Sequence, residues 1–178
     1  MTIQLILEEL QGLFAWLPDE KIDALAEKVA KAPRVFVCGA GRSGLGMKMF
    51  AMRLAQMGKT AFVAGETVTP AIGKGDLLVA ASASGKTAEV CRNVDTAKAA
   101  GADVMVITAA PESTLARENT CICLQAPHKD EKASAGGQPM GSLFEQALVI
   151  LLDGCVLFCM EKLQETASSM RDRHANLE

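Results

Sequence analysis

Three hydroxyl side chains surround one glycine in residues 82–87, which read SASGKT. Ser82, Ser84 and Thr87 supply short hydrogen-bond donors, and Gly85 lets the backbone N–H groups come close to a ligand. If a helix begins here, its unpaired N–H groups and its dipole attract an anion. The segment therefore predicts a binding site for a phosphate monoester. A hydroxyl cluster that only caps the helix is the alternative.

The triplet Gly85-Lys86-Thr87 also invites comparison with the end of a nucleotide-binding Walker A loop. That loop requires a glycine five positions before Gly85, and this sequence has Ala80 there. Hydrolysis of a nucleotide is therefore disfavoured.

A second glycine-rich segment, GAGRSG at residues 39–44, matches the dinucleotide-binding pattern GxGxxG. In that interpretation Glu66 is the acid that binds the ribose, but Arg42 occupies a position where dinucleotide sites usually have a small residue. A tight turn into a helix is the simpler alternative. If the loop serves another site, Arg42 brings a buried cation to it, and Ser43 adds a hydroxyl. A surface salt bridge is the other interpretation of Arg42.

Glu145 lies near the start of a strongly apolar segment, SLFEQALVILLD at residues 142–153. A carboxylate in such surroundings is a candidate general base, able to move a proton between adjacent carbon atoms without a metal or cofactor. The alternative is a glutamate that stabilises the helix dipole. His174, one of two histidines in the chain, is a candidate for moving protons between oxygen atoms.

Six cysteines are present, and none forms a CxxC pair. Most lie in apolar runs, and the N-terminal segment carries glutamates instead of the basic residues of a signal peptide. We therefore expect reduced, buried thiols in a cytoplasmic protein. A zinc site at Cys155 and Cys159 is a weaker alternative, since no histidine is near them in sequence. We expect no metal and no cofactor.

These candidate residues follow short apolar runs at 34–38, 60–63, 77–81, 104–108 and 121–124. Segments with helical character near 43–57, 86–99 and 113–118 separate most of these runs. Short buried strands that alternate with helices predict a parallel sheet covered on both faces, an α/β, three-layer, doubly wound sandwich. In such a sheet ligands bind where strands end, which is where the two loops lie.

The remaining segments complete a single domain over residues 1–178. Two helices separated by Pro18 are expected within 2–31, before an α/β core at 34–163. A polar loop at 125–141 precedes the last long helix, and residues 164–178 read as a polar tail.

Composition limits the classes of partner. Apolar residues make up 49% and charged residues 22% of the chain, enough for one large core. The net charge of -3 argues against a basic surface for nucleic acid. The apolar run at 143–160 contains Glu145, Gln146 and Asp153, which are costly in lipid, so we expect no membrane span.

Over nearly its whole length the sequence resembles the sugar isomerase (SIS) domain family, and in detail its 6-phospho-3-hexuloisomerase group. The segments that carry the resemblance are VFVCGAGRSG, GETVTPAIGKGD, LLVAASASGKT, VITAAPESTLA, QPMGSLFEQALVILLD and the terminal RHANLE. One departure is visible. The serine loop of the family usually reads SGSGET, and Ala83 and Lys86 here replace a glycine and the glutamate, whereas the hydroxyls remain.

The resemblance implies a five-stranded parallel sheet of flavodoxin-like or Rossmann-like type, phosphosugar binding, and a homotetramer whose active sites borrow residues from a neighbouring subunit. The implied reaction converts D-arabino-3-hexulose 6-phosphate to fructose 6-phosphate through an enediolate. Glu145 is then the general base, Arg42 a stabilising cation, Glu66 a ligand of sugar hydroxyls, and His174 a group from the neighbour. Another SIS-type aldose-ketose isomerase, or a non-catalytic sugar-phosphate-binding regulator, are the alternatives.

Overall fold

Five short strands form one parallel sheet in the computed structural model, which describes residues 2–127 and 137–177. The strands are β1 (Arg34–Gly39), β2 (Thr60–Val63), β3 (Leu77–Ala81), β4 (Asp103–Thr108) and β5 (Thr120–Cys123), in the spatial order β2-β1-β3-β4-β5. The predicted parallel, doubly wound sheet is confirmed. The polar loop predicted at 125–141 lies partly outside the described residues.

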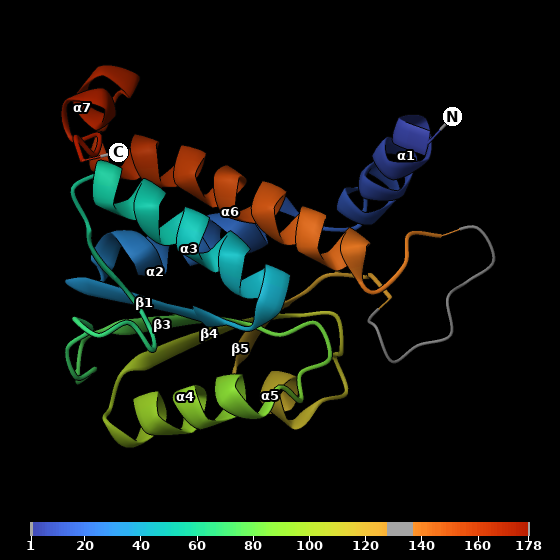
Figure 1. The fold of residues 1–178 in the computed structure, drawn as a ribbon, viewed down its shortest axis with the longest axis horizontal. Helices are drawn as coiled ribbons and strands as arrows, with labels where there is room; N and C mark the ends of the chain where they lie inside the picture. Colours follow the sequence, from blue (N-terminus) through green and yellow to red (C-terminus); the bar gives the residue numbers. More distant parts are fainter. Residues whose placement is uncertain (1, 128–136, 178) are drawn as a thin grey trace.

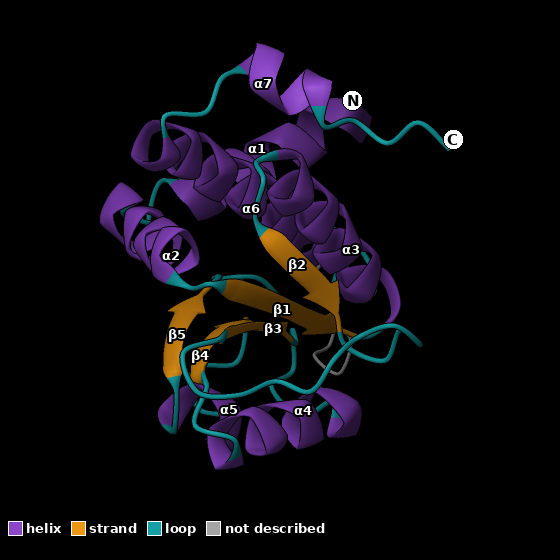
Figure 2. Ribbon diagram, turned by 90° about the vertical axis from the view of Figure 1, so that its left-hand side faces the viewer, coloured by secondary structure: helices purple, strands orange, loops and turns teal. Residues whose placement is uncertain are grey.

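Helices cover both faces of the sheet, as Figures 1 and 2 show. On one face lie α2 (Asp19–Lys31), α3 (Gly41–Gln56) and α6 (Ser142–Leu163), with α1 (Thr2–Phe14) against α6. The other face carries α4 (Ala88–Ala99) and the short α5 (Thr114–Arg117). A last short helix, α7 (Ala167–Asp172), follows α6. The result is the expected three-layer sandwich.

Alternate residues of each strand enter two separate hydrophobic cores. In β1, Val35 and Val37 belong to the larger core under α2, α3 and α6, whereas Phe36 and Cys38 belong to the smaller core under α4. This alternation follows from the pleat, which points successive side chains to opposite faces. It explains why the strands are apolar at nearly every position.

The long helix α6 lies at the centre of the larger core. Its mean hydropathy of 2.0 over an 18-residue window and its length would suffice to cross a membrane, but half of that window is buried inside the protein. Its buried side chains pack against α1, α2 and α3, including Leu148, Leu151 and Cys155. This burial explains its composition without a membrane.

The polar tail contains a short helix. Residues Ala167–Asp172 form α7, which begins with a capping box between Thr166 and Ser169. Arg173 then holds the tail against the end of α3, because its Nη1 donates to the carbonyl of Gln56 at 3.1 Å and to Glu165 Oε2 at 2.8 Å. Thr166 and Ser169 therefore cap the short helix, and Arg173 docks the tail.

Candidate active site

The strand order creates a crevice between the carboxyl ends of β1 and β3. The chain leaves β1 toward α3 on one face of the sheet and leaves β3 toward α4 on the other, so the two following loops diverge there. A cavity of about 350 Å³ occupies this position. Its walls come from the loop after β1, the loop after β3 and the start of α6: Ala40, Gly41, Arg42, Ser43, Ala81, Ser82, Ala83, Ser84, Thr87, Met140, Gly141 and Glu145.

The glycines after β1 have a steric explanation. A Cβ added to Gly44 would lie 2.6 Å from the carbonyl oxygen of Gly39, so the start of α3 packs directly on the end of the strand. Gly41 has a φ of +56°, in the left-handed region that favours glycine. The GxGxxG pattern therefore serves a close turn from strand to helix, whether or not a ligand binds there.

The loop after β3 presents its hydroxyls at the start of α4. The helix begins at Ala88, two residues later than the sequence indicated, and Thr87 stands at its N-cap without a side-chain capping bond. Instead, Thr87 Oγ1 lies 2.8 Å from Ser82 Oγ. Ser84 Oγ accepts a weak hydrogen bond from the Lys86 N–H at 3.3 Å, and Lys86 itself is exposed. The predicted cluster of three hydroxyls is thus assembled beside a helix N-terminus.

Gly85 shapes this loop by leaving room for its neighbours. It has a φ of +62°, and an added Cβ would lie 2.1 Å from Ser113 Oγ. Its N–H donates to the carbonyl of Ser82 at 3.1 Å, so that group closes the turn. Thr108, at the end of β4, supports the loop from behind by donating from Oγ1 to the carbonyl of Ala83 at 3.2 Å.

Thr108 and Ser113 are supporting residues to which the sequence analysis gave no role. Both are buried and line the back of the serine loop rather than the cavity. The sequence carried a usable signal for Thr108, because a buried hydroxyl residue at the end of an apolar strand must either face a ligand or bond to the backbone nearby.

Glu145 and Arg42 meet at the mouth of the cavity. Arg42 Nε donates to Glu145 Oε2, and the two side chains are 68% and 19% exposed. The expectation of a buried cation is wrong for this subunit, because the Arg42 side chain, in the first turn of α3, is largely exposed to solvent. The ion pair holds the two proposed catalytic groups together.

The remaining predicted site residues do not join this cavity within one subunit. Glu66 forms an ion pair with Lys48, 2.6 Å apart, and lies outside the cavity lining. His174 lies beyond the far end of α6, where its Nδ1 is 2.9 Å from the Ala175 carbonyl oxygen. Glu145 and Leu163 are separated by about 27 Å along the helix, at 1.5 Å per residue. Figure 1 shows the two ends of α6 on opposite sides of the molecule.

The cysteines offer no evident nucleophile in this region. Cys38, the residue just before the first glycine loop, is buried, and burial raises the pKa of its thiol to about 12. The hydrogen bond with Cys159 and burial likewise raise the pKa of Cys155. Across the described ranges, no group of three or more His, Cys, Asp or Glu side chains lies close enough to hold a metal ion.

Comparison with known proteins gives a consistent result. The model of the SIS domain family matches residues 28–153. The 3-hexulose-6-phosphate isomerase of Bacillus subtilis (strain 168) is 39% identical over 177 residues, covering 97% of this chain and 95% of that protein. The 3-hexulose-6-phosphate isomerase of Mycobacterium gastri is 40% identical over 179 residues, covering 99% and 90%.

A solved structure agrees with these sequence relatives. The crystal structure of a Methanococcus jannaschii protein, for which a molecular function of 3-hexulose-6-phosphate isomerase was inferred, superposes with a TM-score of 0.85. The two chains are 29% identical, and the match covers 99% of each.

Proposed function

The chain belongs to the SIS domain family of phosphosugar isomerases, and on this basis we propose that it interconverts D-arabino-3-hexulose 6-phosphate and fructose 6-phosphate. One observation carries the proposal: a single cavity joins a hydroxyl-lined helix N-terminus to a partly buried carboxylate. The first group suits a phosphate and the second suits proton transfer. The relatives named 3-hexulose-6-phosphate isomerase support this choice of substrate.

The phosphate binds in the serine loop. Ser82, Ser84 and Thr87 surround the start of α4, where the helix dipole adds to their hydrogen bonds. Hydrogen bonds to a charged phosphate are stronger than those between neutral groups, so this end of the substrate fixes its position. Ser43, at the start of α3, faces the same cavity.

Glu145 acts as the general base on the carbon chain. It removes the proton from C2 of the 3-hexulose, and the electrons of that C–H bond form an enediolate across C2 and C3. Return of the proton to C3 leaves the carbonyl at C2, as in fructose 6-phosphate, once the oxygens have exchanged their own proton. Arg42, paired with Glu145, supplies positive charge beside the developing oxyanion.

Two other functions use the same cavity differently. An aldose-ketose isomerase requires the carboxylate at C1 and C2, whereas a regulator requires the phosphate site and no base. The Glu145–Arg42 pair beside the serine loop supports catalysis, because proton transfer between carbon atoms requires a base and phosphate binding does not.

The proposed active form is a homotetramer in which His174 serves a neighbouring subunit. Its distance from Glu145 in the same chain requires a second copy if it is to act on the substrate. Apolar side chains also remain exposed along α3 and α6 at helical spacing, as expected of helices that face another subunit. They are Leu45, Met49, Met52, Ile150 and Leu157.

An isomerase assay over a panel of sugar phosphates tests the proposal. We expect turnover of D-arabino-3-hexulose 6-phosphate, with far lower rates on glucose 6-phosphate and arabinose 5-phosphate. In heavy water the product should carry deuterium at carbon, since the base exchanges part of its proton with solvent. Turnover of an aldose alone would transfer the assignment to the aldose-ketose class, and binding without turnover would favour the regulator.

A further inference from the structure

Met140 combines two features that folding alone does not explain. Its backbone has a φ of +59°, in the left-handed region that glycine and, less often, asparagine and aspartate adopt. Its side chain is 73% exposed. A single exposed apolar side chain is ordinary on a protein surface, but one kept on a strained backbone is not.

The strain belongs to a tight turn that leads into α6. The Ser142 N–H donates to the carbonyl of Pro139 at 3.1 Å. Both residues between them, Met140 and Gly141, have positive φ. Type I′ turns have this pattern, and their first central position strongly favours glycine, asparagine or aspartate. The Gly141 carbonyl then accepts the Glu145 N–H at 3.2 Å, so the turn fixes the start of the helix that carries the proposed base.

Contacts on both sides hold the turn in this conformation. Gln138, the residue before Pro139, donates from Nε2 to Glu9 Oε2 of α1 at 2.9 Å. Its Oε1 accepts from Gln146 Nε2 of α6 at 2.7 Å. The hydroxyl of Ser142 donates to the Pro139 carbonyl at 2.7 Å. Strained residues persist where their surroundings fix them in this way, and such residues cluster at ligand sites.

The location of Met140 supplies a ligand for this strain to serve. The residue lines the cavity between the serine loop and Glu145. Among the described residues that line this cavity, Met140 is the only large apolar one, and the others are small, hydroxylic or charged. The hydroxyls suit a phosphate and the charged pair suits proton transfer, so Met140 is left to contact the C–H groups of a sugar. A flexible, unbranched side chain adapts well to such a surface.

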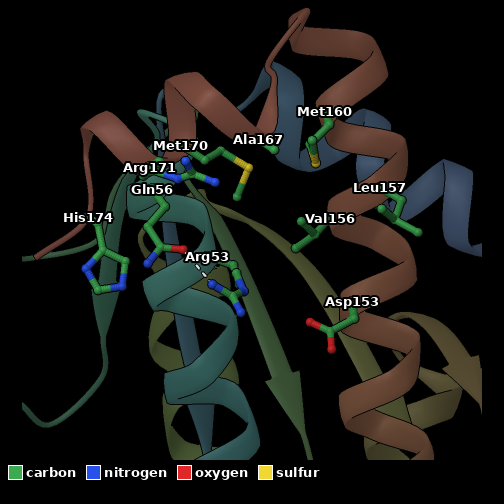
Figure 3. A pocket seen from close by; sticks show the side chains of 10 residues that line it. All are labelled: Arg53, Gln56, Asp153, Val156, Leu157, Met160, Ala167, Met170, Arg171 and His174. Atoms are coloured by element: carbon green, nitrogen blue, oxygen red, sulfur yellow. Dashed lines mark hydrogen bonds between the residues drawn. The ribbon is translucent and has the colours of Figure 1, made fainter.

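Two other methionines beside a cavity have a structural explanation. Met160 and Met170 line a cavity of about 470 Å³ at the other end of α6, which Figure 3 shows. Both lie in helices, and both pack against the larger core. Met140 belongs to neither of the two cores. Packing therefore explains Met160 and Met170 and does not explain Met140.

We propose that Met140 binds the substrate directly, packing against the carbon chain of the phosphosugar while the serine loop holds the phosphate. This inference rests on the proposed function and adds a substrate-contacting residue to it. Contact with the sugar removes the exposed apolar surface of Met140 from water and so contributes to affinity. The strained turn places this side chain beside the first turn of α6, where Glu145 lies.

Three substitutions at Met140 separate the side chain from its backbone. Met140→Gly removes the side chain and relieves the strain, so affinity for fructose 6-phosphate should fall about tenfold while the Tm stays the same or rises. Met140→Ala keeps the strain and should lose the same affinity. Met140→Leu keeps the apolar volume and should bind within about twofold of the unmodified protein. Calorimetric titration of the assembled protein measures affinity, and inorganic phosphate, which lacks the carbon chain, should bind all three variants unchanged.

Met160→Ala is the control with the opposite expectation. It removes packing from the core, so it should lower the Tm and leave the affinity for both ligands unchanged. Unchanged affinity of Met140→Gly and Met140→Ala for fructose 6-phosphate would overturn the proposal. Dissociation of the assembled protein by these two variants, seen by size-exclusion chromatography, would also overturn it, because Met140 would then serve a subunit contact.

Failure of the proposed function gives a different result. A protein that binds fructose 6-phosphate through Met140, yet turns over no hexulose phosphate, would lose the isomerase assignment and keep this contact. An unmodified protein that binds fructose 6-phosphate no more tightly than inorganic phosphate would refute the contact itself, since the carbon chain would then add nothing to affinity.

Discussion

The two oxygen atoms of the Glu145 carboxylate have different surroundings at the mouth of the cavity. Arg42 donates to Oε2, and no described side chain donates to Oε1. One oxygen can therefore hold the carboxylate in place while the other accepts a proton from carbon. A base that moves a proton between two adjacent carbons requires such an arrangement, with one oxygen held and the other able to accept the proton.

Replacing Glu145 by Gln keeps the volume of the side chain and removes its basic oxygen. We expect kcat to fall by about 10²–10⁴, the usual contribution of a general base, with substrate still bound. Steady-state kinetics measure the change, and Glu161→Gln, on the exposed side of the same helix, is the matched control. Near-normal turnover would show that Glu145 only interacts with the helix dipole, an interaction that contributes about 0.3–1 kcal/mol to stability.

The hydroxyls of the serine loop should control KM. Each alanine replacement of Ser84 or Thr87 removes a charge-assisted hydrogen bond worth about 1.5–3 kcal/mol, so KM should rise about tenfold or more. Kinetics with the double variant measure the effect, and Ser168→Ala, an exposed hydroxyl on α7, is the control. An unchanged KM in the double variant places the phosphate elsewhere.

At the scale of elements, the loop that joins β2 to β3 is held by one partly buried ion pair, between Arg34 and Asp76. Asp76 is 2% exposed and accepts from Arg34 Nε at 2.8 Å and from the Gly73 N–H at 2.7 Å. Arg34 also donates to the carbonyl of Ala71, so the start of β1 anchors both ends of the turn. The hydrogen bonds from Arg34 lower the pKa of Asp76 below its usual value.

Changing Asp76 to Asn should therefore lower the Tm at pH 7 by roughly 3–8 °C. Because the folded pKa is depressed, the contribution of Asp76 is complete above its usual pKa of about 3.9 and is lost as the pH falls below it. The difference in Tm between the two proteins should shrink in acid. Thermal melts across pH measure this, and Asp103→Asn, at an exposed ion pair with Lys28, should change the Tm little at any pH.

Elements were largely predictable from the sequence, and side-chain partners were not. The five apolar runs located the strands within a residue or two, because a strand buried on both faces has to be apolar throughout. The serine loop could be located because it directly follows a strand, and Glu145 because it lies in the first turn of a helix. The exposure of Arg42, the pairing of Glu66 with Lys48 and the docking of Arg173 depend on segments far apart in sequence, and periodicity carries no information on them.

At the scale of the whole molecule, the two proposed catalytic residues lie at opposite ends of one long helix. Glu145 is in the first turn of α6, and His174 follows α7 beyond its last turn. A subunit with this arrangement cannot bring both groups to one substrate. The proposed tetramer resolves the difficulty, since symmetric contacts give every site one residue from each of two chains.

Mixing two inactive variants tests this arrangement. Glu145→Gln and His174→Ala should each lose most activity, yet chains that are mixed, unfolded and refolded together should regain part of it. About a quarter of the sites in a random mixture would combine intact residues from different chains.

Deleting residues 171–178 should reduce activity more than Tm, since residues 171–177 are exposed. Full activity of the truncated protein would remove His174 from the mechanism.

The proposed phosphate site and the proposed base lie on opposite layers of the sandwich, and this separation limits which carbon of the substrate the base can reach. The serine loop precedes α4 on one face of the sheet, whereas Glu145 belongs to α6 on the other, so the packed sheet fixes the span between them. A phosphosugar anchored by its phosphate then offers the carboxylate only the carbons at that span. A sugar that is shorter by one carbon presents different atoms to the carboxylate. We therefore expect pentulose 5-phosphates to bind as inhibitors and to turn over poorly. Competition kinetics measure their Ki, and direct assays of the same sugars measure their kcat/KM.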